Sequence, residues 1–335
     1  MALNTNLHKA AQAKNDEFYT QLSDIEQELG NYKQHFRGKI VYCNCDDPTV
    51  SQFFYYFSNS FAILGLKKLI TTCYKNQQRD LFSRHDVKKA IKLEYEGFRK
   101  YERMANIEDI GVTQLKEDGD FRSPECIALL KEADIVVTNP PFSLFREYVA
   151  QLIEHDRKFI IIGNKNAITY REIFPLIKTN RLWIGNTPMS KDLLFDVPDE
   201  YAQEMVATKK EGSSYKIVDG VVKGRSQSIW FTNLDHKKRH EELILYRKYT
   251  PEDYPHYDNY DAINVDETKD IPKDWAGVMG VPISFMDKYN PDQFEIIGSN
   301  RGRNQDPDGV YGRGSVLNGK ETFKRLFIRN RRPQT

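Results

Sequence analysis

The chain lacks any stretch of 18 or more consecutive apolar residues, so its sequence predicts no transmembrane helix. Its first residues also lack the basic-then-apolar pattern of a secretory signal. Cysteine is scarce, and the few cysteines present make no disulfide framework. They are Cys43, Cys45, Cys73 and Cys126. Because no second Cys/His pair stands at ligand spacing from the first two, we expect no metal site, and a reducing cytoplasm fits this composition best.

The chain also lacks a strong charge of either sign. Its formal net charge is +1, which by itself indicates no nucleic-acid partner. Basic residues are nevertheless clustered, most densely at 320–332, where six of them face the single acid Glu321. Smaller clusters stand at 237–240 and 301–303. Such clusters can neutralise phosphates, although a solvated surface is the alternative for each one taken singly.

Apolar strand-like runs alternate with helical patterns in the first half of the chain. We expect strands at 39–45, 68–73, 134–139 and 158–163. We expect helices near 24–36, from Pro48 through 53–57 to Gly65, and near 124–131 and 144–155. This order predicts an α/β fold with a parallel sheet covered on both faces. Residues 75–103 are strongly charged and look like an excursion between core elements. Regular periodicity fades after about residue 185.

This loss of regular hydrophobic periodicity predicts two functional regions. Residues 1–185 would form a cofactor-binding and catalytic core. Residues 186–335 would form an irregular, polar recognition region, which could return a strand or two to the core sheet.

The most informative motif is a loop that follows the strand-like run 134–138 and consists of Asn139, Pro140, Pro141 and Phe142. The two prolines have no backbone proton and a fixed φ, so they lock a short, rigid loop at the carboxyl end of the strand. Asn139 and the Pro140 carbonyl could accept both N–H bonds of an exocyclic amino group while Phe142 stacks on its ring. The alternative is a tight strand-to-helix connection without chemistry.

Those two acceptors suit one reaction in particular. An exocyclic aromatic amine is a poor nucleophile because its lone pair is delocalised into the ring. Two acceptors that pull the nitrogen toward tetrahedral geometry localise the lone pair, and no ionised base is needed beforehand. Inside a duplex this amine is out of reach, so the base must leave the stack, and Phe142 would receive it.

The electrophile should bind at the same edge of the sheet, because ligands of such sheets bind outside the carboxyl ends of the strands. No G-x-G-x-x-G follows the first strand, and residues 43–48 offer acids and a helix start instead. This favours a cofactor with a cationic centre and without phosphate, such as S-adenosylmethionine. Asp120 could accept a bond from its adenine amino group while Phe121 packs on its ring. The alternative for Asp120 is a helix cap.

The chain resembles the EcoRI-type adenine-specific DNA methyltransferases over roughly residues 8–332. The resemblance is carried by residues 16–20, 42–48, 119–123, 134–145, 257–264 and 277–283. It implies a Rossmann-like, S-adenosylmethionine-dependent methyltransferase sheet followed by an irregular target-recognition region. It also implies methyl transfer to N6 of a flipped-out adenine in duplex DNA, within or derived from a restriction-modification system.

The resemblance extends to individual residues. The catalytic loop would be Asn139, Pro140, Pro141 and Phe142. The cofactor would contact Phe18, Tyr19 and Thr20 with its methionine part, Asp120 and Phe121 with its adenine, and also Asn139. Further cofactor candidates, by their position at the end of the first strand, are Cys43, Asn44, Asp46 and Asp47. The alternative for residues 18–20 is an aromatic anchor before a helix.

The chain departs from the family pattern at the second strand. This strand ends in Thr72, Cys73 and Tyr74, where many relatives have an acid that holds the ribose hydroxyls. The residue that binds the ribose is therefore open, and Glu94 or Glu96 in the charged segment 75–103 could bind it.

DNA contacts are expected mainly in the C-terminal half and beside the catalytic edge. The candidates are Lys165, Asn166, Lys324, Arg325, Arg329 and Arg331. The expected partner is double-stranded DNA bound by a monomer, with no membrane and no metal, and with any cognate restriction endonuclease acting separately.

Two other functions are compatible with the same residues. Asn-Pro-Pro-aromatic loops also serve enzymes that methylate RNA bases or glutamine side chains in proteins. A DNA-binding protein with a degenerate methyltransferase core is the second alternative, and the intact loop with Asp120 counts against it.

Overall fold

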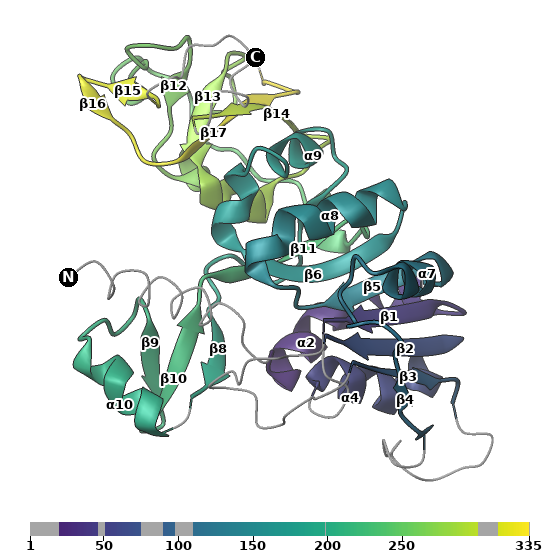
Figure 1. The fold of residues 1–335 in the computed structure, drawn as a ribbon. Coiled ribbons are helices and arrows are strands. Elements are labelled where there is room, and N and C mark those ends of the chain that lie inside the picture. Colours follow the sequence, from purple (N-terminus) through teal and green to yellow (C-terminus); the bar gives the residue numbers. More distant parts are fainter. Residues whose placement is uncertain are drawn as a thin grey trace. The chain divides into compact units, whose positions relative to one another are not determined.

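The computed structural model describes residues 20–45, 51–74, 90–97, 110–197, 199–300 and 314–334 (Figure 1). The chain forms two compact units. Unit 1 comprises Met1–Lys165 and Lys191–Leu234, and unit 2 comprises Asn166–Ser190 and Asp235–Thr335. Residues 191–234 thus fold with the N-terminal part of the chain. The functional boundary expected near residue 185 remains a prediction.

Unit 1 is built on a mixed sheet. In the order of the sheet, its strands are β4 (Thr113–Gln114), β3 (Ile91–Tyr95), β2 (Lys68–Cys73), β1 (Ile40–Asn44), β5 (Ile135–Thr138), β6 (Lys158–Asn164) and β11 (Ser228–Thr232). The four central strands β2, β1, β5 and β6 run parallel to one another. They are almost entirely buried, which explains their continuous apolar runs. The outer strands β3, β4 and β11 pair antiparallel.

Helices cover both faces of this sheet, as the sequence predicts (Figure 1). The face that includes Val41 and Cys43 packs in one core cluster with residues of the N-terminal helices. These are α2 (Leu22–Leu29), α3 (Lys33–Phe36), α4 (Gln52–Asn59) and α5 (Phe61–Leu64), with the 3₁₀ turn η1 (Gly30–Tyr32) between the first two. The opposite face carries Tyr42 and Asn44 and meets α7 (Pro124–Glu132) and α8 (Phe145–Glu154).

The long helix expected at 24–36 is divided into α2, η1 and α3, and an exposed Gly30 begins the 3₁₀ turn. Glycine weakens a helix interior, so a break there is physically reasonable. The helix expected from Pro48 to Gly65 is divided into α4 and α5 at Ser60, and its expected start lies outside the described residues. The other central elements lie within about two residues of their expected bounds.

A second antiparallel sheet belongs to unit 1. Its strands are β8 (Leu193–Asp196), β10 (Val221–Ser226) and β9 (Tyr215–Val218), in the order of the sheet, with α10 (Asp199–Ala207) between β8 and β9 in the chain. Leu193 and Phe195 join the main core cluster, which anchors this sheet. The chain then returns to the main sheet as β11.

Unit 2 contains its own sheet, β12 (Ile263–Asn264), β13 (Met279–Pro282), β17 (Arg325–Asn330) and β14 (Phe294–Ser299), and a small hairpin of β15 (Val316–Leu317) and β16 (Lys320–Glu321). Its other elements are α9 (Phe174–Lys178), β7 (Trp183–Ile184), η4 (Lys237–His240), η5 (Thr268–Asp270) and η6 (Ile283–Lys288). Aromatic contacts fill the interior of unit 2: the rings of Phe285 and Phe294 meet edge to face at 5.1 Å. The region is therefore more regular than its sequence pattern suggests.

No helix in the described part of the chain combines the length and apolar character that crossing a membrane requires.

Candidate active site

The carboxyl ends of β1 and β5 are tied together at one edge of the sheet. The two strands are parallel neighbours, with Tyr42 opposite Val136. At their ends, Thr138 Oγ1 donates a hydrogen bond to the Asn44 carbonyl, and Tyr148 Oη on α8 donates to Asn44 Oδ1. All three side chains are buried. Buried polar groups that satisfy one another fix the backbone around them, so the residue after Thr138 starts from a defined position.

That residue is Asn139, and the loop that follows is short and supported. Asn139 is half-buried with its side-chain oxygen shielded from solvent, and Pro140 is buried. Pro141 precedes the 3₁₀ turn η2 (Phe142–Leu144), and its carbonyl accepts a bond from the Leu144 N–H at 3.0 Å. Phe142 is half-buried against the main core cluster. The structure thus has a short loop at the strand end where the two prolines stand, and its rigidity stays a prediction.

The 119–121 turn lies at the carboxyl end of β2. Gly119 has a φ of +79°, and a Cβ at this position would be 2.3 Å from the carbonyl oxygen of Cys73, the last residue of β2. Only glycine permits this approach. Phe121 is buried, with its ring centroid 5.1 Å from that of Tyr148. The Phe121 carbonyl also accepts a bond from Gln151 on α8 at 3.1 Å. One helix therefore holds both the turn and the end of β1.

The carboxylate of Asp120 is held by Arg122. Arg122 Nη2 and Nε lie 2.7 Å and 2.9 Å from the two carboxylate oxygens, and the Arg122 N–H donates to one of them at 2.8 Å. The side-chain hydrogen bond from Arg122 lowers the pKa of Asp120, although partial burial opposes this shift. The α7 helix is capped by Ser123, whose Oγ accepts the Cys126 N–H at 3.2 Å. Asp120 is therefore not the cap of this helix, and the capping alternative is wrong.

The remaining cofactor candidates are placed differently. Phe18, Tyr19, Asp46 and Asp47 lie outside the described residues. Thr20 is buried, and its hydroxyl has no hydrogen-bond partner among the residues that the structure describes. The Cys43 side chain packs in the apolar core cluster, on the face opposite to Asn44, so a contact between its thiol and a cofactor at this edge is not supported.

Glu94 and Glu96 do not lie at the edge of the sheet formed by the carboxyl ends of β1, β2 and β5. In the antiparallel register of β3 on β2, Ile91 lies opposite Cys73, at the carboxyl end of β2, whereas Glu94 lies opposite Ile70. Glu96 follows still farther toward the amino end. Glu94 also pairs with Lys68 at 2.6 Å and Lys92 at 3.0 Å. The expectation that one of them holds the ribose is therefore wrong, because β3 runs opposite to the direction that would bring them to this edge.

The predicted DNA contacts fall into two groups. Lys165 and Asn166 directly follow β6, and in unit 2 Asn166 Oδ1 accepts a bond from Lys324 Nζ at 2.5 Å. Arg329 is exposed and lies 3.6 Å from Glu295. These positions suit a DNA surface.

Arg325 and Arg331 instead make contacts within unit 2. The Arg325 side chain is only 12% exposed and lies 3.4 Å from both Asn264 and Asp266. Arg331 Nε donates to the carbonyls of Pro291 and Phe294 at 3.1 and 3.3 Å. A phosphate would have to compete with these contacts, so the structure favours a folding role for both.

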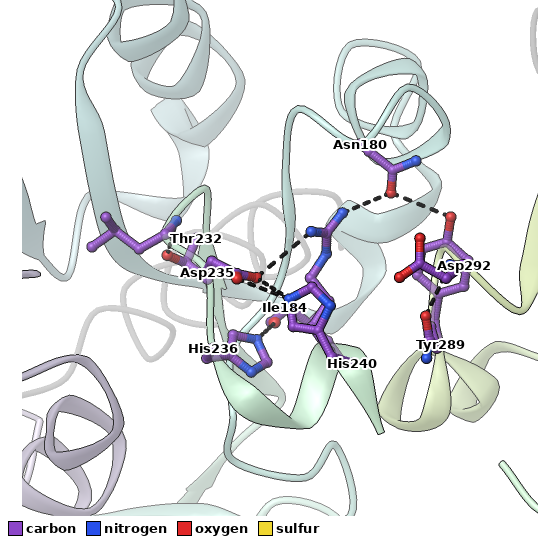
Figure 2. A network of polar contacts seen from close by, with 11 residues as sticks. Asn180, Ile184, Thr232, Asp235, His236, His240, Tyr289 and Asp292 are labelled. Atoms are coloured by element: carbon purple, nitrogen blue, oxygen red, sulfur yellow. Dashed lines mark hydrogen bonds and ion pairs between the residues drawn. The ribbon is translucent and has the colours of Figure 1, made fainter. Parts of the chain in front are cut away.

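The basic cluster at η4 is likewise engaged inside unit 2. His240 Nε2 lies 2.8 Å from both Asp235 carboxylate oxygens, and His236 Nε2 donates to the Ile184 carbonyl at 3.1 Å (Figure 2). The guanidinium of Arg239 stacks over the Trp183 ring at 3.8 Å and donates to Asn180 Oδ1 at 2.9 Å. Burial lowers the pKa of Arg239. This cluster connects two segments of unit 2 and is a weaker candidate for phosphate contacts than its sequence suggests.

Tyr148 is a residue of the site that the sequence pattern does not single out. It connects Asn44 and Phe121, yet it stands in the apolar stripe of α8 and looks like an ordinary core residue. The hydroxyl is the one hint in the sequence, because a buried tyrosine requires a hydrogen-bond partner, but the partner itself is not visible there.

Comparison with known proteins agrees with this geometry. The model of the family "Adenine-specific methyltransferase EcoRI" matches residues 6–331. The chain is 48% identical over 335 residues to Type II methyltransferase M.EcoRI of Escherichia coli, covering 99% of this chain and 98% of the relative. It is 37% identical over 296 residues to Type II methyltransferase M.MpnI of Mycoplasma pneumoniae, covering 87% and 84%.

A third relative is Type II methyltransferase M.MgeORF184P of Mycoplasma genitalium, 39% identical over 300 residues. No solved structure matches the chain. The family match over nearly the whole length and the identity to M.EcoRI lead to one conclusion: the chain belongs to the EcoRI family of adenine-specific methyltransferases.

Proposed function

We propose that the protein transfers a methyl group from S-adenosylmethionine to N6 of an adenine extruded from duplex DNA. The observation that supports this most directly is the placement of the 139–142 loop. It starts from a strand end fixed by Asn44 and Tyr148, and the same helix α8 holds the 119–121 turn. An amino-group site and a candidate cofactor turn therefore share the carboxyl edge of one sheet.

In this proposal the loop residues act on the adenine amino group. Asn139 Oδ1 and the Pro140 carbonyl accept its two N–H bonds, and Phe142 stacks on the base. Localising the lone pair directs N6 toward the methyl group. Because the acceptors are neutral and fixed before the base arrives, little reorganisation is needed in the transition state.

The residues present fit S-adenosylmethionine, which supplies an electrophilic methyl group on a sulfonium centre. Asp120 stays ionised and can still accept a bond from an adenine amino group, since a carboxylate offers more acceptor positions than Arg122 uses. Gly119 lets this turn approach the end of β2. The buried Thr20 hydroxyl without a described partner is available to a bound group. We assign Phe18, Tyr19, Asp46 and Asp47 to the same site by the family resemblance.

The substrate is inferred from the relatives. All three relatives are named Type II methyltransferases. This supports a role for this chain in a restriction-modification system. We propose a monomer acting on double-stranded DNA, with Lys165, Asn166, Lys324 and Arg329 near the backbone. A cognate endonuclease, where one exists, would act separately on the same sequence.

The decisive experiment uses purified full-length chain, radiolabelled S-adenosylmethionine and three acceptors in parallel: unmethylated bacterial DNA, total RNA and a protein extract. Label recovered as N6-methyladenine in DNA is the expected result. Label in RNA or in protein glutamine would assign the loop to another acceptor. DNA binding without any transfer would instead indicate a degenerate core.

A further inference from the structure

Phe323 is an aromatic side chain held out into solvent. It is 85% exposed and lies in the three-residue connection 322–324 between β16 and β17. Single exposed apolar residues are common on proteins, and Ile244 in the same unit is 84% exposed. The surroundings of Phe323 distinguish it from Ile244.

The backbone around Phe323 is clamped by a buried asparagine. Asn300, which is 2% exposed, donates through Nδ2 to the Phe323 carbonyl at 2.8 Å and accepts the Arg325 N–H through Oδ1 at 2.7 Å. The same Nδ2 donates to Ser315 Oγ at 2.9 Å, and Ser315 Oγ is 2.5 Å from Thr322 Oγ1. The ring is thus presented on a fixed backbone, which reduces the entropy lost when it meets a partner.

The chemistry around Phe323 suits a polyanion. Lys320 and Lys324 stand within three residues of Phe323 in the chain, and Glu321 is the one acid in the segment 320–332. The next residue, Lys324, reaches Asn166, which stands two residues after the last residue of β6. A rigid apolar ring flanked by cations is the arrangement with which proteins enter a stack of bases while neutralising the adjacent phosphates.

We propose that Phe323 is a wedge that enters the base stack of the bound duplex. This inference rests on the proposed function, because it takes DNA as the substrate. It assigns to unit 2 a contact that distorts the duplex, separate from the catalytic loop of unit 1. The ring would partly unstack one base step, and the basic residues beside it would hold the flanking backbone.

Its test begins with the DNA sequence that the wild-type chain methylates, mapped by detecting N6-methyladenine in the genome of a host that expresses the protein. A duplex oligonucleotide carrying this sequence is then compared among wild type, Phe323→Ala, Phe323→Tyr and the matched control Ile244→Ala. We expect Phe323→Ala to lose about tenfold in DNA affinity or in kcat/KM, as the loss of one stacking contact would cause. Phe323→Tyr and Ile244→Ala should stay within about twofold of wild type.

A second measurement detects unstacking of the bases directly. Duplexes that carry 2-aminopurine at successive positions report unstacking as a rise in fluorescence when protein binds. Besides the target adenine, whose extrusion should raise fluorescence in every variant, wild type should show a rise at one further step that is lost in Phe323→Ala and kept in Ile244→Ala. Equal kinetics and equal fluorescence for wild type and Phe323→Ala would overturn the wedge. Absence of DNA methylation by wild type would instead overturn the proposed function.

Discussion

At the scale of single residues, the candidate site depends on neutral acceptors more than on charge. Asn139 and the Pro140 carbonyl need no particular protonation state, so their positions matter most. Those positions derive from the buried contacts of Asn44 with Thr138 and Tyr148. The sequence indicates Asn139 because prolines follow it. It cannot indicate the Tyr148 contact, since residues more than one hundred positions apart meet only in the folded chain.

Replacing Asn139 with alanine should lower kcat for methyl transfer by about 100-fold or more, because it removes an acceptor that acts mainly in the transition state. Binding of S-adenosylmethionine and of DNA should change little. Asn139→Asp is the matched variant and should keep more activity than alanine, since a carboxylate also accepts hydrogen bonds. Single-turnover kinetics with parallel binding titrations check this. Activity of the alanine variant within about tenfold of wild type would remove the assigned role.

Asp120→Ala should weaken binding of S-adenosylmethionine by about tenfold, the order expected for one hydrogen bond to a charged group. Since Arg122 lowers the pKa of Asp120, its ionic contact with Arg122 is present above the ordinary pKa of an aspartate. This contact is lost only as the pH falls through the lower, folded-state pKa. Cofactor affinity of wild type should therefore show no Asp120 transition between about pH 5 and 8. Isothermal titration across this range, with Arg122→Ala as a comparison, tests both statements, and an unchanged affinity of Asp120→Ala would assign this residue to the turn alone.

At the scale of elements, strands and helices with a strong period could be predicted and the edge of the sheet could not. The buried runs at β2 and β6 and the helices α7 and α8 stand close to their expected places. The strand β3 lies in the charged segment 75–103 and was not predicted. Residues 91–95 nevertheless alternate apolar and charged side chains with a period of two. Its charges are compensated by a neighbouring strand, because Glu94 pairs with Lys68 on β2. Pairing across strands is not visible in one segment.

Gly119→Ala tests how the 119–121 turn is positioned on β2. Alanine there would combine an unfavourable positive φ with a Cβ 2.3 Å from the Cys73 carbonyl. Gly111→Ala is the matched control, since Gly111 has a φ of +83° and nothing within 4 Å of its Cβ position. We expect the control to cost about 1 kcal/mol in free energy of unfolding, and Gly119→Ala to cost about 2 kcal/mol more and to weaken cofactor binding. Denaturant unfolding and titration with S-adenosylmethionine measure both. Equal losses in the two variants would show that the close approach to β2 has no role.

At the scale of the whole molecule, basic residues divide into those that contact exposed side chains and those that hold the backbone of unit 2. The sequence cluster at 320–332 does not distinguish them. Lys324 contacts the Asn166 side chain and the exposed Arg329 lies beside Glu295, whereas Arg331, which is also exposed, donates to the backbone carbonyls of Pro291 and Phe294. Net charge is almost zero, so DNA affinity has to come from such local groups.

This division predicts different salt dependences. The slope of log affinity against log salt concentration falls by about 0.9 for each phosphate contact removed from duplex DNA. Lys324→Ala should therefore reduce the slope by about 0.9, the value for one phosphate contact, and leave thermal stability unchanged. Arg331→Ala should keep the slope and lower the melting temperature, because it removes two hydrogen bonds that hold the backbone at Pro291 and Phe294. Fluorescence anisotropy over a salt series, with calorimetry on the same variants, separates the two. A reduced slope for Arg331→Ala at unchanged stability would return Arg331 to the DNA surface and show that its contacts with the two carbonyls give way when DNA binds.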